Sequence, residues 1–313
     1  MILLLQYTII FASVLMLVAI GGCFAEHSGV INLGLEGIMV LGALGGAIAM
    51  NVIPATASPV VMFLGVFACS VVLGTIYSCL LGFACINLQA NQTLIGTAMN
   101  MLATALAAVI ARAYNISRNP EDTSTILNYV NSKKLFLAKI GSFEFNWFMA
   151  VAAVALVISY VVLYKTRFGL RMRACGENPQ AADSVGINVY KMRWAGVLIS
   201  GVLGGLGGIT YITAGVSEWK FEVGVAGFGF LALAVMIFGE WKPHKIALAA
   251  ILFGFFRALS NVYTGFSFLA NLGIPSTVYN MLPYIISLIV LAFTSENSAA
   301  PKAEGIPYEK GMR

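Results

Sequence analysis

Residues 1–23, MILLLQYTIIFASVLMLVAIGGC, decide the fold class, because they form one long apolar run without a charged side chain. A helix of about 20 apolar residues is long enough to cross the hydrocarbon core of a bilayer. The end of the run, Ile20 to Cys23, loosely resembles a lipoprotein cleavage site, which would make the run a signal peptide. No Lys or Arg precedes the run and further apolar runs follow it directly. We therefore expect a retained first transmembrane helix.

The rest of the chain has the same character. Of its 313 residues, 59% are apolar and only 10% are charged, and the mean hydropathy is +0.89. A soluble core cannot hide that much apolar surface, so membrane lipids must surround most of the chain. We expect an all-α polytopic membrane protein with about 8–10 transmembrane helices. The expected spans are 2–22, 33–53, 58–86, 93–112, 147–164, 194–214, 225–239, 246–262 and 277–294.

The charges of the loops predict the orientation of these spans. Loop 165–193 carries six Lys or Arg residues against two acidic residues, so we expect it on the cytoplasmic side. Alternation then places loop 113–146 and the N-terminus outside and the tail, 295–313, in the cytoplasm. The transmembrane domain accordingly spans 1–294. The net charge of +5 fits this topology, and no basic stripe with interleaved aromatic residues indicates a nucleic-acid partner.

Glycine-rich segments inside the spans predict close helix packing. Gly42 and Gly46 lie in the hexapeptide LGALGG, and Gly204 and Gly208 lie in LGGLGG, which differs from it at one position. Both pairs have the G-x-x-x-G spacing that lets helix backbones approach each other. A two-half internal repeat, as found in many transporters, is one interpretation of the similar hexapeptides. Chance recurrence of Leu, Ala and Gly in membrane helices is the other.

The sequence has no motif of an enzyme that acts on its own. It contains no P-loop that would bind ATP and no Gly-x-Ser-x-Gly. Its two histidines, His27 and His244, are too far apart in the sequence for a zinc-binding H-E-x-x-H motif. We therefore expect no catalytic residue, no metal and no cofactor in this chain.

Polar residues at the mouths of spans are the candidates for a substrate path, because polar groups are costly in lipid. Asn32 and Glu36, in GVINLGLEG, are one helical turn apart and are expected to share a helix face. The segment 88–100 contributes Gln89, Asn91, Gln92, Thr93, Thr97 and Asn100. This amide-rich start favours a broken or unwound helix that exposes backbone groups to a cavity.

Structural roles are the alternative for each group. Asn32 and Glu36 would then cap a helix, and the amides would form hydrogen bonds between helices. The position of Arg257, towards the outer end of the eighth span, favours a role in neutralising a buried group over contact with the substrate.

Residues 173–188, RACGENPQAADSVGIN, form a polar hairpin between long apolar runs. Asn178 is a suitable cap, and Pro179 a suitable first residue, for a short helix over QAADSVG. Such a helix, lying parallel to the membrane on the cytoplasmic side, gives a soluble partner something to push against.

At this point the chain resembles a known family: permease subunits of bacterial ATP-binding-cassette (ABC) importers, in the branch that includes branched-chain amino-acid, ribose and nucleoside permeases. The similar segments are GVINLGLEGIMVLGA, GENPQAADSVGIN, GFGFLALAVMIFGEWKP, ALAAILFGF and the tail PKAEGIPYEKGMR. The INLGLEG and GENPQAA segments are most similar to the nucleoside importers.

The resemblance implies a set of partners in the bacterial cytoplasmic membrane. Two permease subunits, not necessarily identical, form the pore; two ATPase domains bind ATP below it; and an extracellular lipoprotein delivers the substrate. The hairpin would be the coupling helix that contacts the ATPase. Its implied coupling residues are Glu177, Asn178, Pro179, Ala181, Ala182 and Gly186.

The resemblance also implies the substrate. A nucleoside is neutral and has hydroxyls and an aromatic base, so its path should offer amides and aromatic faces without fixed charge. Ribose or branched-chain amino acids are the alternative within the same importer class. An ion-coupled secondary transporter would need a carboxylate within the membrane, and Glu36 is the candidate that lies near a span mouth.

Overall fold

The computed structural model describes residues 2–54, 56–127, 129–141, 143–215, 220–266, 273, 275–294 and 300–310. Helices occupy all the expected spans, so the prediction of an all-α polytopic membrane protein is confirmed. They are α1 (Ile2–His27), α2 (Leu35–Val52), α3 (Pro59–Gly82), α4 (Gln92–Arg118), α6 (Trp147–Lys165), α9 (Val189–Thr210), α10 (Phe228–Phe238), α11 (Pro243–Val262) and α13 (Ser276–Thr294). α4 continues to Arg118, so the first residues of the expected outer loop 113–146 are helical.

Helix α10 differs from the prediction of a full span over 225–239. It has 11 residues, which gives a length of about 16 Å, roughly half of the hydrocarbon core. Seven helices among the described residues are long and apolar enough to cross a membrane, and α10 and α13 are not among them. The prediction was wrong because 225–239 is as apolar as a true span, and hydropathy does not show where the helix begins.

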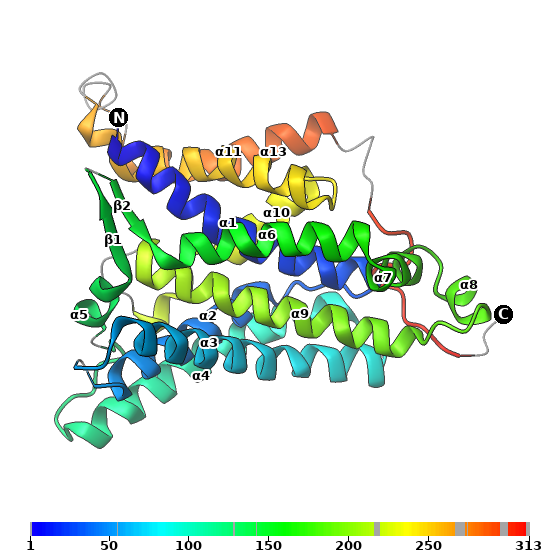
Figure 1. The fold of residues 1–313 in the computed structure, drawn as a ribbon, viewed down its shortest axis with the longest axis horizontal. Helices are drawn as coiled ribbons and strands as arrows, with labels where there is room; N and C mark the ends of the chain where they lie inside the picture. The colour runs from blue at the N-terminus through cyan, green and yellow to red at the C-terminus, as the bar shows by residue number, and fades with distance from the viewer. Residues whose placement is uncertain are drawn as a thin grey trace.

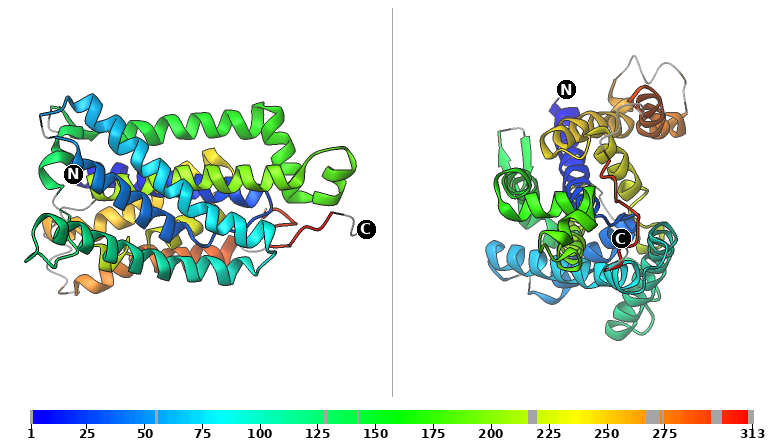
Figure 2. Two further views of the ribbon diagram at one scale, coloured as in Figure 1. Left: turned by 90° about the horizontal axis from the view of Figure 1, so that it is seen from below. Right: turned by 90° about the vertical axis from the view of Figure 1, so that its right-hand side faces the viewer.

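Short elements mark the two ends of the molecule (Figure 1). At one end lie the N-terminus, α5 (Val130–Lys133) and a hairpin of β1 (Leu137–Ile140) and β2 (Phe143–Asn146), paired antiparallel with Leu137 opposite Asn146. At the other end lie the C-terminus, α7 (Arg167–Glu177) and α8 (Pro179–Ser184). We call these the β end and the hairpin end; Figure 2 shows the same separation in a second view.

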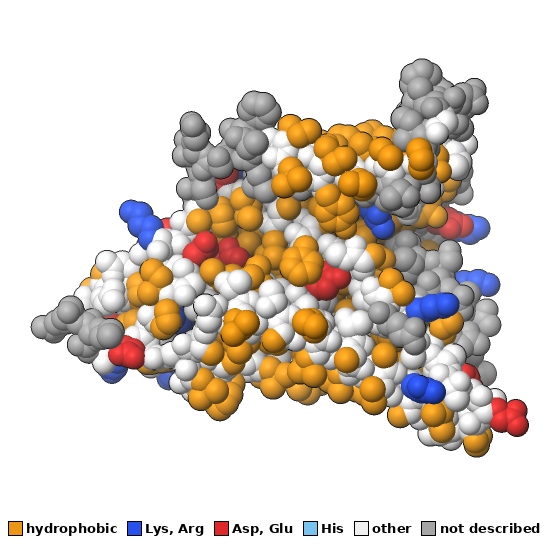
Figure 3. Space-filling view, turned by 180° about the vertical axis from the view of Figure 1, so that it is seen from behind, with side chains coloured by type: hydrophobic (Ala, Val, Ile, Leu, Met, Phe, Trp, Pro, Cys, Tyr) orange, Lys and Arg blue, Asp and Glu red, His pale blue; other side chains and the backbone are white. Residues whose placement is uncertain are grey.

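The interior of the bundle is formed by α2 and α9. In both helices 78% of the most apolar window is buried, against 28% in α3, α4 and α6. Helix α9 packs against α1, α2 and α3. The outer helices therefore present most of their apolar side chains to lipid or to another subunit. Apolar side chains spread over the middle of the face in Figure 3, while most Lys and Arg side chains lie towards the two ends.

The four glycines expected to pack helices all lie where α2 meets α9. A methyl group on Gly42 would collide with the backbone of Gly205, and one on Gly208 would collide with the backbone of Met39. Gly46 and Gly204 face apolar side chains of the opposite helix in the same way. The two similar hexapeptides thus face each other across this contact, and the two-half repeat stays a prediction.

Candidate functional site: a polar junction within the bundle

Two segments outside the α-helices enter the bundle and lead into helices; the second includes one 3₁₀ turn, Phe221–Val223. Residues 28–34 precede α2, and residues 220–227 precede α10. Asn32, in the first segment, donates from Nδ2 to Oγ of Ser200, near the middle of α9, at 2.7 Å. After the second segment, the Phe228 ring lies 5.5 Å from the ring of Phe11 in α1, centroid to centroid. Both segments therefore reach membrane depth, where unpaired backbone groups are costly.

The first segment is held by side-chain amides. Asn100 Oδ1 accepts from the Gly37 N–H, and Asn100 Nδ2 donates to the Leu33 carbonyl, each at 2.8 Å. Gln92 Oε1 accepts from the Ile31 N–H at 2.6 Å. Both amides belong to α4. Side chains of this helix therefore supply hydrogen-bond partners to backbone groups that have none within a helix of their own.

The second segment is held by one carboxylate. Glu36 accepts from the Gly227 N–H at 2.8 Å with Oε1 and from the Gly229 N–H at 2.7 Å with Oε2. These N–H groups form the start of α10, where the helix dipole places partial positive charge. Gly227 has a φ of +78°, a left-handed conformation that glycine adopts without strain. Glu36 therefore occupies and neutralises the anion-binding end of the half-helix.

Aromatic side chains and one cation surround this helix start. The Arg257 guanidinium lies 5.3 Å from the centroid of the Phe228 ring, within cation–π range. The Tyr284 hydroxyl donates to the Ala226 carbonyl at 3.2 Å. Phe230, the next aromatic residue of α10, is 48% exposed. The start of α10 is thus not sealed inside this chain.

Helix α4 borders the same region. A methyl group on Gly224 would lie 3.6 Å from Thr104 Oγ1 and 3.9 Å from Glu36 Oε1, so both side chains face the segment before α10. We call Glu36, Thr104, Phe228, Phe230, Arg257 and Tyr284 the α10 junction. It combines hydroxyls, aromatic rings, an acid paired with backbone N–H groups and the Arg257 cation.

One expectation about the predicted path residues was wrong, and a second holds only in part. Asn32 and Glu36 do not share a helix face, because α2 begins only at Leu35. Asn32 is directed to α9 and Glu36 to α10. The break expected in 88–100 is confined to residues 88–91, which are not helical and of which 89–91 line a cavity; α4 is regular from Gln92 onward. Further unwound backbone lies in the segments that the polar side chains of α4 and Glu36 pair.

The other polar residues predicted in 88–100 cap α4, contact the C-terminal segment or are exposed. Asn91 caps α4 by accepting from the Leu94 N–H at 3.1 Å. Gln89 donates to the Tyr308 carbonyl at 3.3 Å. Thr93 and Thr97 are exposed, and the Thr97 hydroxyl bonds to carbonyls of its own helix. Because Thr97 and Thr104 are seven residues apart, they lie on the same side of α4.

Sequence analysis missed Thr104, Phe230 and Tyr284. The available signal was the glycine-rich run GVAGFGF, 224–230, which differs from an ordinary span by its three glycines. Such an interruption inside an apolar segment is a pointer to a discontinuous helix.

The polar hairpin has one exposed face and one buried face. Asn178 caps α8 by accepting from the Ala181 N–H at 3.0 Å. Among the predicted coupling residues, Glu177, Asn178, Ala181 and Gly186 are exposed, whereas Pro179 and Ala182 are buried. The expectation of partner contact does not suit Pro179 and Ala182, because this face of α8 packs inward.

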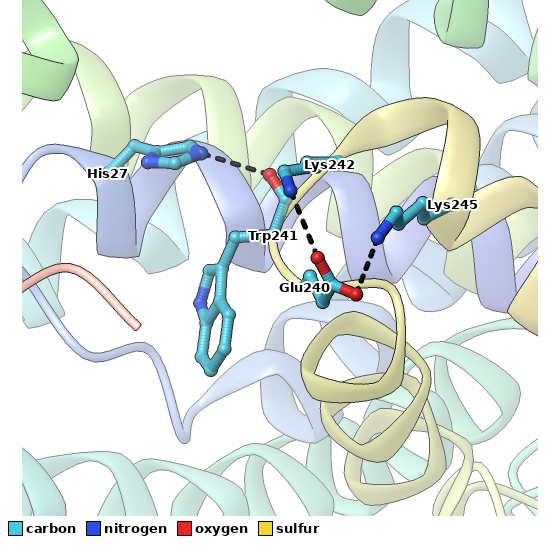
Figure 4. Close-up of polar contacts among 5 residues, drawn as sticks. All are labelled: His27, Glu240, Trp241, Lys242 and Lys245. Atoms are coloured by element: carbon cyan, nitrogen blue, oxygen red, sulfur yellow. Dashed lines mark hydrogen bonds and ion pairs between the residues drawn. The ribbon is translucent and has the colours of Figure 1, made fainter. Parts of the chain in front are cut away.

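The corner between α10 and α11 ties the half-helix to α1 (Figure 4). The Trp241 carbonyl accepts from Nε2 of His27 at 3.0 Å. Beside it, Glu240 bridges Lys242 and Lys245, and the hydrogen bonds from Lys245 and Lys242 lower the pKa of Glu240 to about 2. The hairpin-side end of α10 is therefore fixed, whereas its first turn carries the exposed Phe230.

Comparisons with known proteins agree with this architecture. The family described as "Branched-chain amino acid transport system / permease component" matches residues 4–292. The chain is 38% identical to the nucleoside ABC transporter permease protein NupC of Lactococcus lactis, over 96% of this chain and 95% of that one. It is 37% identical to the guanosine ABC transporter permease protein NupQ of Bacillus subtilis, over 98% and 96% of the two chains. It is also 29% identical to a second L. lactis nucleoside permease, NupB, over 59% and 52%.

These similarities cover the whole bundle, including the α10 junction and the hairpin, so the resemblance inferred from the sequence is confirmed. A permease of this kind is a multi-pass subunit of the bacterial cytoplasmic membrane. It is not an enzyme and works with a second permease and an ATPase. The chain belongs to the permease family of ABC transport systems that is named after branched-chain amino-acid transport.

Proposed function

We propose that this chain is the nucleoside-translocating permease of an ABC importer. The observation that carries the proposal is its near full-length similarity to NupC and NupQ, which are named for nucleoside and guanosine transport. The α10 junction supports it independently, because its chemistry suits a neutral aromatic substrate.

The start of α10 argues against an anionic substrate. A helix N-terminus is a ready site for a carboxylate or phosphate. Here Glu36 already accepts from Gly227 and Gly229, so a second carboxylate at this place would meet like charge. An amino acid carries such a carboxylate, whereas a nucleoside carries none. Nucleosides therefore suit this junction better than branched-chain amino acids.

The exposed aromatic groups suit a nucleobase. Phe230 and Tyr284 are 48% and 38% exposed, and a planar base stacks favourably on aromatic rings. The hydroxyls of Thr97 and Thr104 would serve polar atoms of the sugar or base. In this proposal Asn32, Gln92 and Asn100 shape the path by holding residues 28–37 and do not contact the substrate.

The exposed side of α10 is the proposed wall of a pore shared with a second permease. Helices α4 and α13 lie far apart when the molecule is seen from the hairpin end (Figure 2), and α13 packs on α10 and α11. A second permease covering this side would close the path. The similarity to both NupC and NupB, two permeases of one organism, supports a non-identical partner.

The remaining partners follow from this arrangement. ATP would be bound by ATPase chains that contact Glu177, Asn178, Ala181 and Gly186 at the hairpin end, with no cofactor in this chain. A substrate-binding lipoprotein would dock at the β end. Ala181→Trp tests the ATPase contact better than a change of Gly186, because Gly186 has a φ of +82° and any side chain there strains the turn.

The test is uptake by cells that lack this gene and are then complemented with it. Radiolabelled uridine, adenosine, ribose and leucine are supplied separately, with and without depletion of ATP. We expect ATP-dependent loss and recovery of nucleoside uptake alone. Loss confined to ribose or leucine would contradict the proposed substrate. Uptake that persists without ATP but follows an ion gradient would contradict the importer itself.

A further inference from the structure

The C-terminal segment, residues 300–310, lies across the hairpin end of the molecule and is the red trace in Figure 1. We call it the strap. Its residues alternate between buried positions, Pro301, Ala303 and Tyr308, and exposed ones such as Lys302 and Glu309. A polar tail without contacts would not show this pattern, so the strap is a packed part of the fold.

One side of the strap is fixed to the cytoplasmic hairpin. The Ala303 N–H donates to the Gly176 carbonyl at the end of α7, at 2.8 Å. The buried Tyr308 side chain clusters with Cys175 of α7, Ala182 of α8 and Val189 of α9. Ala182, the inward-facing residue of the hairpin, therefore contacts the strap.

The strap is also fixed to the membrane helices. Its carbonyls at Ile306 and Tyr308 accept from Arg193 Nη2 at 2.9 Å and from Gln89 Nε2 at 3.3 Å. Gly305 lies against Ile31, in the unwound segment before α2: a methyl group on it would be 2.7 Å from Ile31 Cδ1. The strap thus connects the hairpin to the α1–α2 and α3–α4 connections.

A buried acid pair continues the connection to α10. The Glu304 carboxyl lies beside the carboxyl of Glu26 at the end of α1, close enough for each to affect the pKa of the other. Two carboxyl groups this close hydrogen-bond when one of them carries a proton, and burial raises the pKa of Glu304. Glu26 Oε2 also accepts from the indole N–H of Trp241, at the corner that ends α10. The contacts are therefore continuous from α8 through Tyr308, Glu304, Glu26 and Trp241 to the half-helix.

We propose that the strap transmits movement of the cytoplasmic hairpin to α10, so that its contacts couple ATP hydrolysis to substrate passage. This inference rests on the proposed function, because it needs an ATPase that moves the hairpin. Direct contact carries part of the same movement, since Gly176 packs against the backbone of His27 in α1. The strap adds a second link that reaches the Trp241 corner. A contiguous chain of contacts suggests coupling but requires a coupling measurement to establish it.

The experiment uses the whole importer, purified with its ATPase and second permease and reconstituted in proteoliposomes with its binding protein. The measured quantity is uridine transported per ATP hydrolysed. Tyr308→Ala removes the ring that anchors the strap to the hairpin, and Glu304→Ala removes the bond to Glu26. Each should lower the ratio about fivefold or more, while ATP hydrolysis continues.

Conservative variants serve as matched controls. Tyr308→Phe keeps the ring and Glu304→Gln keeps a hydrogen-bond donor for Glu26, so both should retain the wild-type ratio. Glu309→Ala changes an exposed residue of the same strap and should have no effect. Copurification of the ATPase is measured for every variant, and the ratio is calculated per assembled complex.

A double variant tests whether Tyr308 and Glu304 act through one connection or cause two independent defects. If both residues belong to one connection, Tyr308→Ala and Glu304→Ala together should lower the ratio no further than the stronger single variant. An unchanged ratio in both single variants, with wild-type uridine transport intact, would overturn the strap inference and leave the proposed function standing. Absence of ATP-dependent uridine transport by the wild-type complex would instead refute the proposed function.

Discussion

The two unwound segments reach similar depths in the bundle but are held in different ways. Residues 28–34 are paired by neutral amides of α4, with Asn100 acting as both donor and acceptor. At residues 220–227 the start of α10 is paired by the single carboxylate of Glu36. Both segments lead into a helix start, and Glu36 lies at both of them: it belongs to the first turn of α2 and accepts from the first N–H groups of α10. We propose that the first segment has a structural role and that the second selects the substrate.

The largest expected effect comes from Glu36→Ala. It leaves the N–H groups of Gly227 and Gly229 without their acceptor, at about 1–3 kcal/mol for each group. We expect nucleoside uptake to fall at least about tenfold, which corresponds to ~1.4 kcal/mol. Glu36→Gln keeps one acceptor oxygen and should lie between this variant and wild type. Normal uptake by Glu36→Ala at normal expression would contradict the proposal that the two segments differ in function.

Asn100→Leu alters the first segment and should have the next largest effect. It removes the partners of the Gly37 N–H and the Leu33 carbonyl. We expect a loss of about 1–2 kcal/mol in stability, measured as a lower midpoint of thermal unfolding in detergent. Uptake by the protein that still folds should keep its substrate preference. A changed preference would mean that the first segment also contacts substrate.

A pair of glycines tests the backbone of the two segments. Gly227→Ala, before α10, forces a side chain into a φ of +78° and places its methyl group 3.0 Å from Tyr284 Oη. We expect a cost of about 1 kcal/mol. Gly34→Ala, before α2, is the matched control, because Gly34 has a φ of −81° that alanine adopts readily. Equal midpoints of thermal unfolding for the two variants would contradict this account.

The smallest effect is expected for Thr97→Val. Its hydroxyl bonds only to carbonyls of α4 among the contacts that the structure describes, so stability should stay within about 0.5 kcal/mol of wild type. Loss of a polar contact in the path should raise the KM of uridine uptake about twofold, equivalent to ~0.4 kcal/mol. An unchanged KM would exclude Thr97 from the substrate path and confine that path to the α10 side.

The helices were predictable because a hydrocarbon environment requires apolar segments of a fixed length. The α10 half-helix was not, since 225–239 is apolar throughout and its start depends on Glu36, nearly two hundred positions earlier in the chain. Gln92 and Asn100 could be singled out as costly polar residues. Their partners could not be predicted, because these are backbone groups of another segment that become available only after the bundle has formed. The role of the packing glycines was easier to predict, since a small residue allows close approach wherever two helices cross.

Local patterns also explain what was predictable at the hairpin. Asn178 and Pro179 predict the start of α8 from adjacent residues alone. Which side of α8 faces a partner depends on the strap, and the sequence PKAEGIPYEKGMR has no periodicity that predicts packing against α7 and α8. Ala182 was therefore placed among the contact residues, although it is buried next to Tyr308.

The most direct measurement compares two single cysteines in the assembled importer, after exposed Cys69 and half-buried Cys79 have been replaced by serine. Phe230→Cys lies beside the start of α10, and Val157→Cys lies on the outer face of α6; the native side chains are 48% and 63% exposed. The central claim is that water reaches the start of α10 but not the outer face of α6. It predicts that a water-soluble, membrane-impermeant thiol reagent modifies Phe230→Cys, that uridine slows this reaction, and that Val157→Cys stays unmodified. Equal reactivity at the two positions, or modification of Val157→Cys alone, would contradict it.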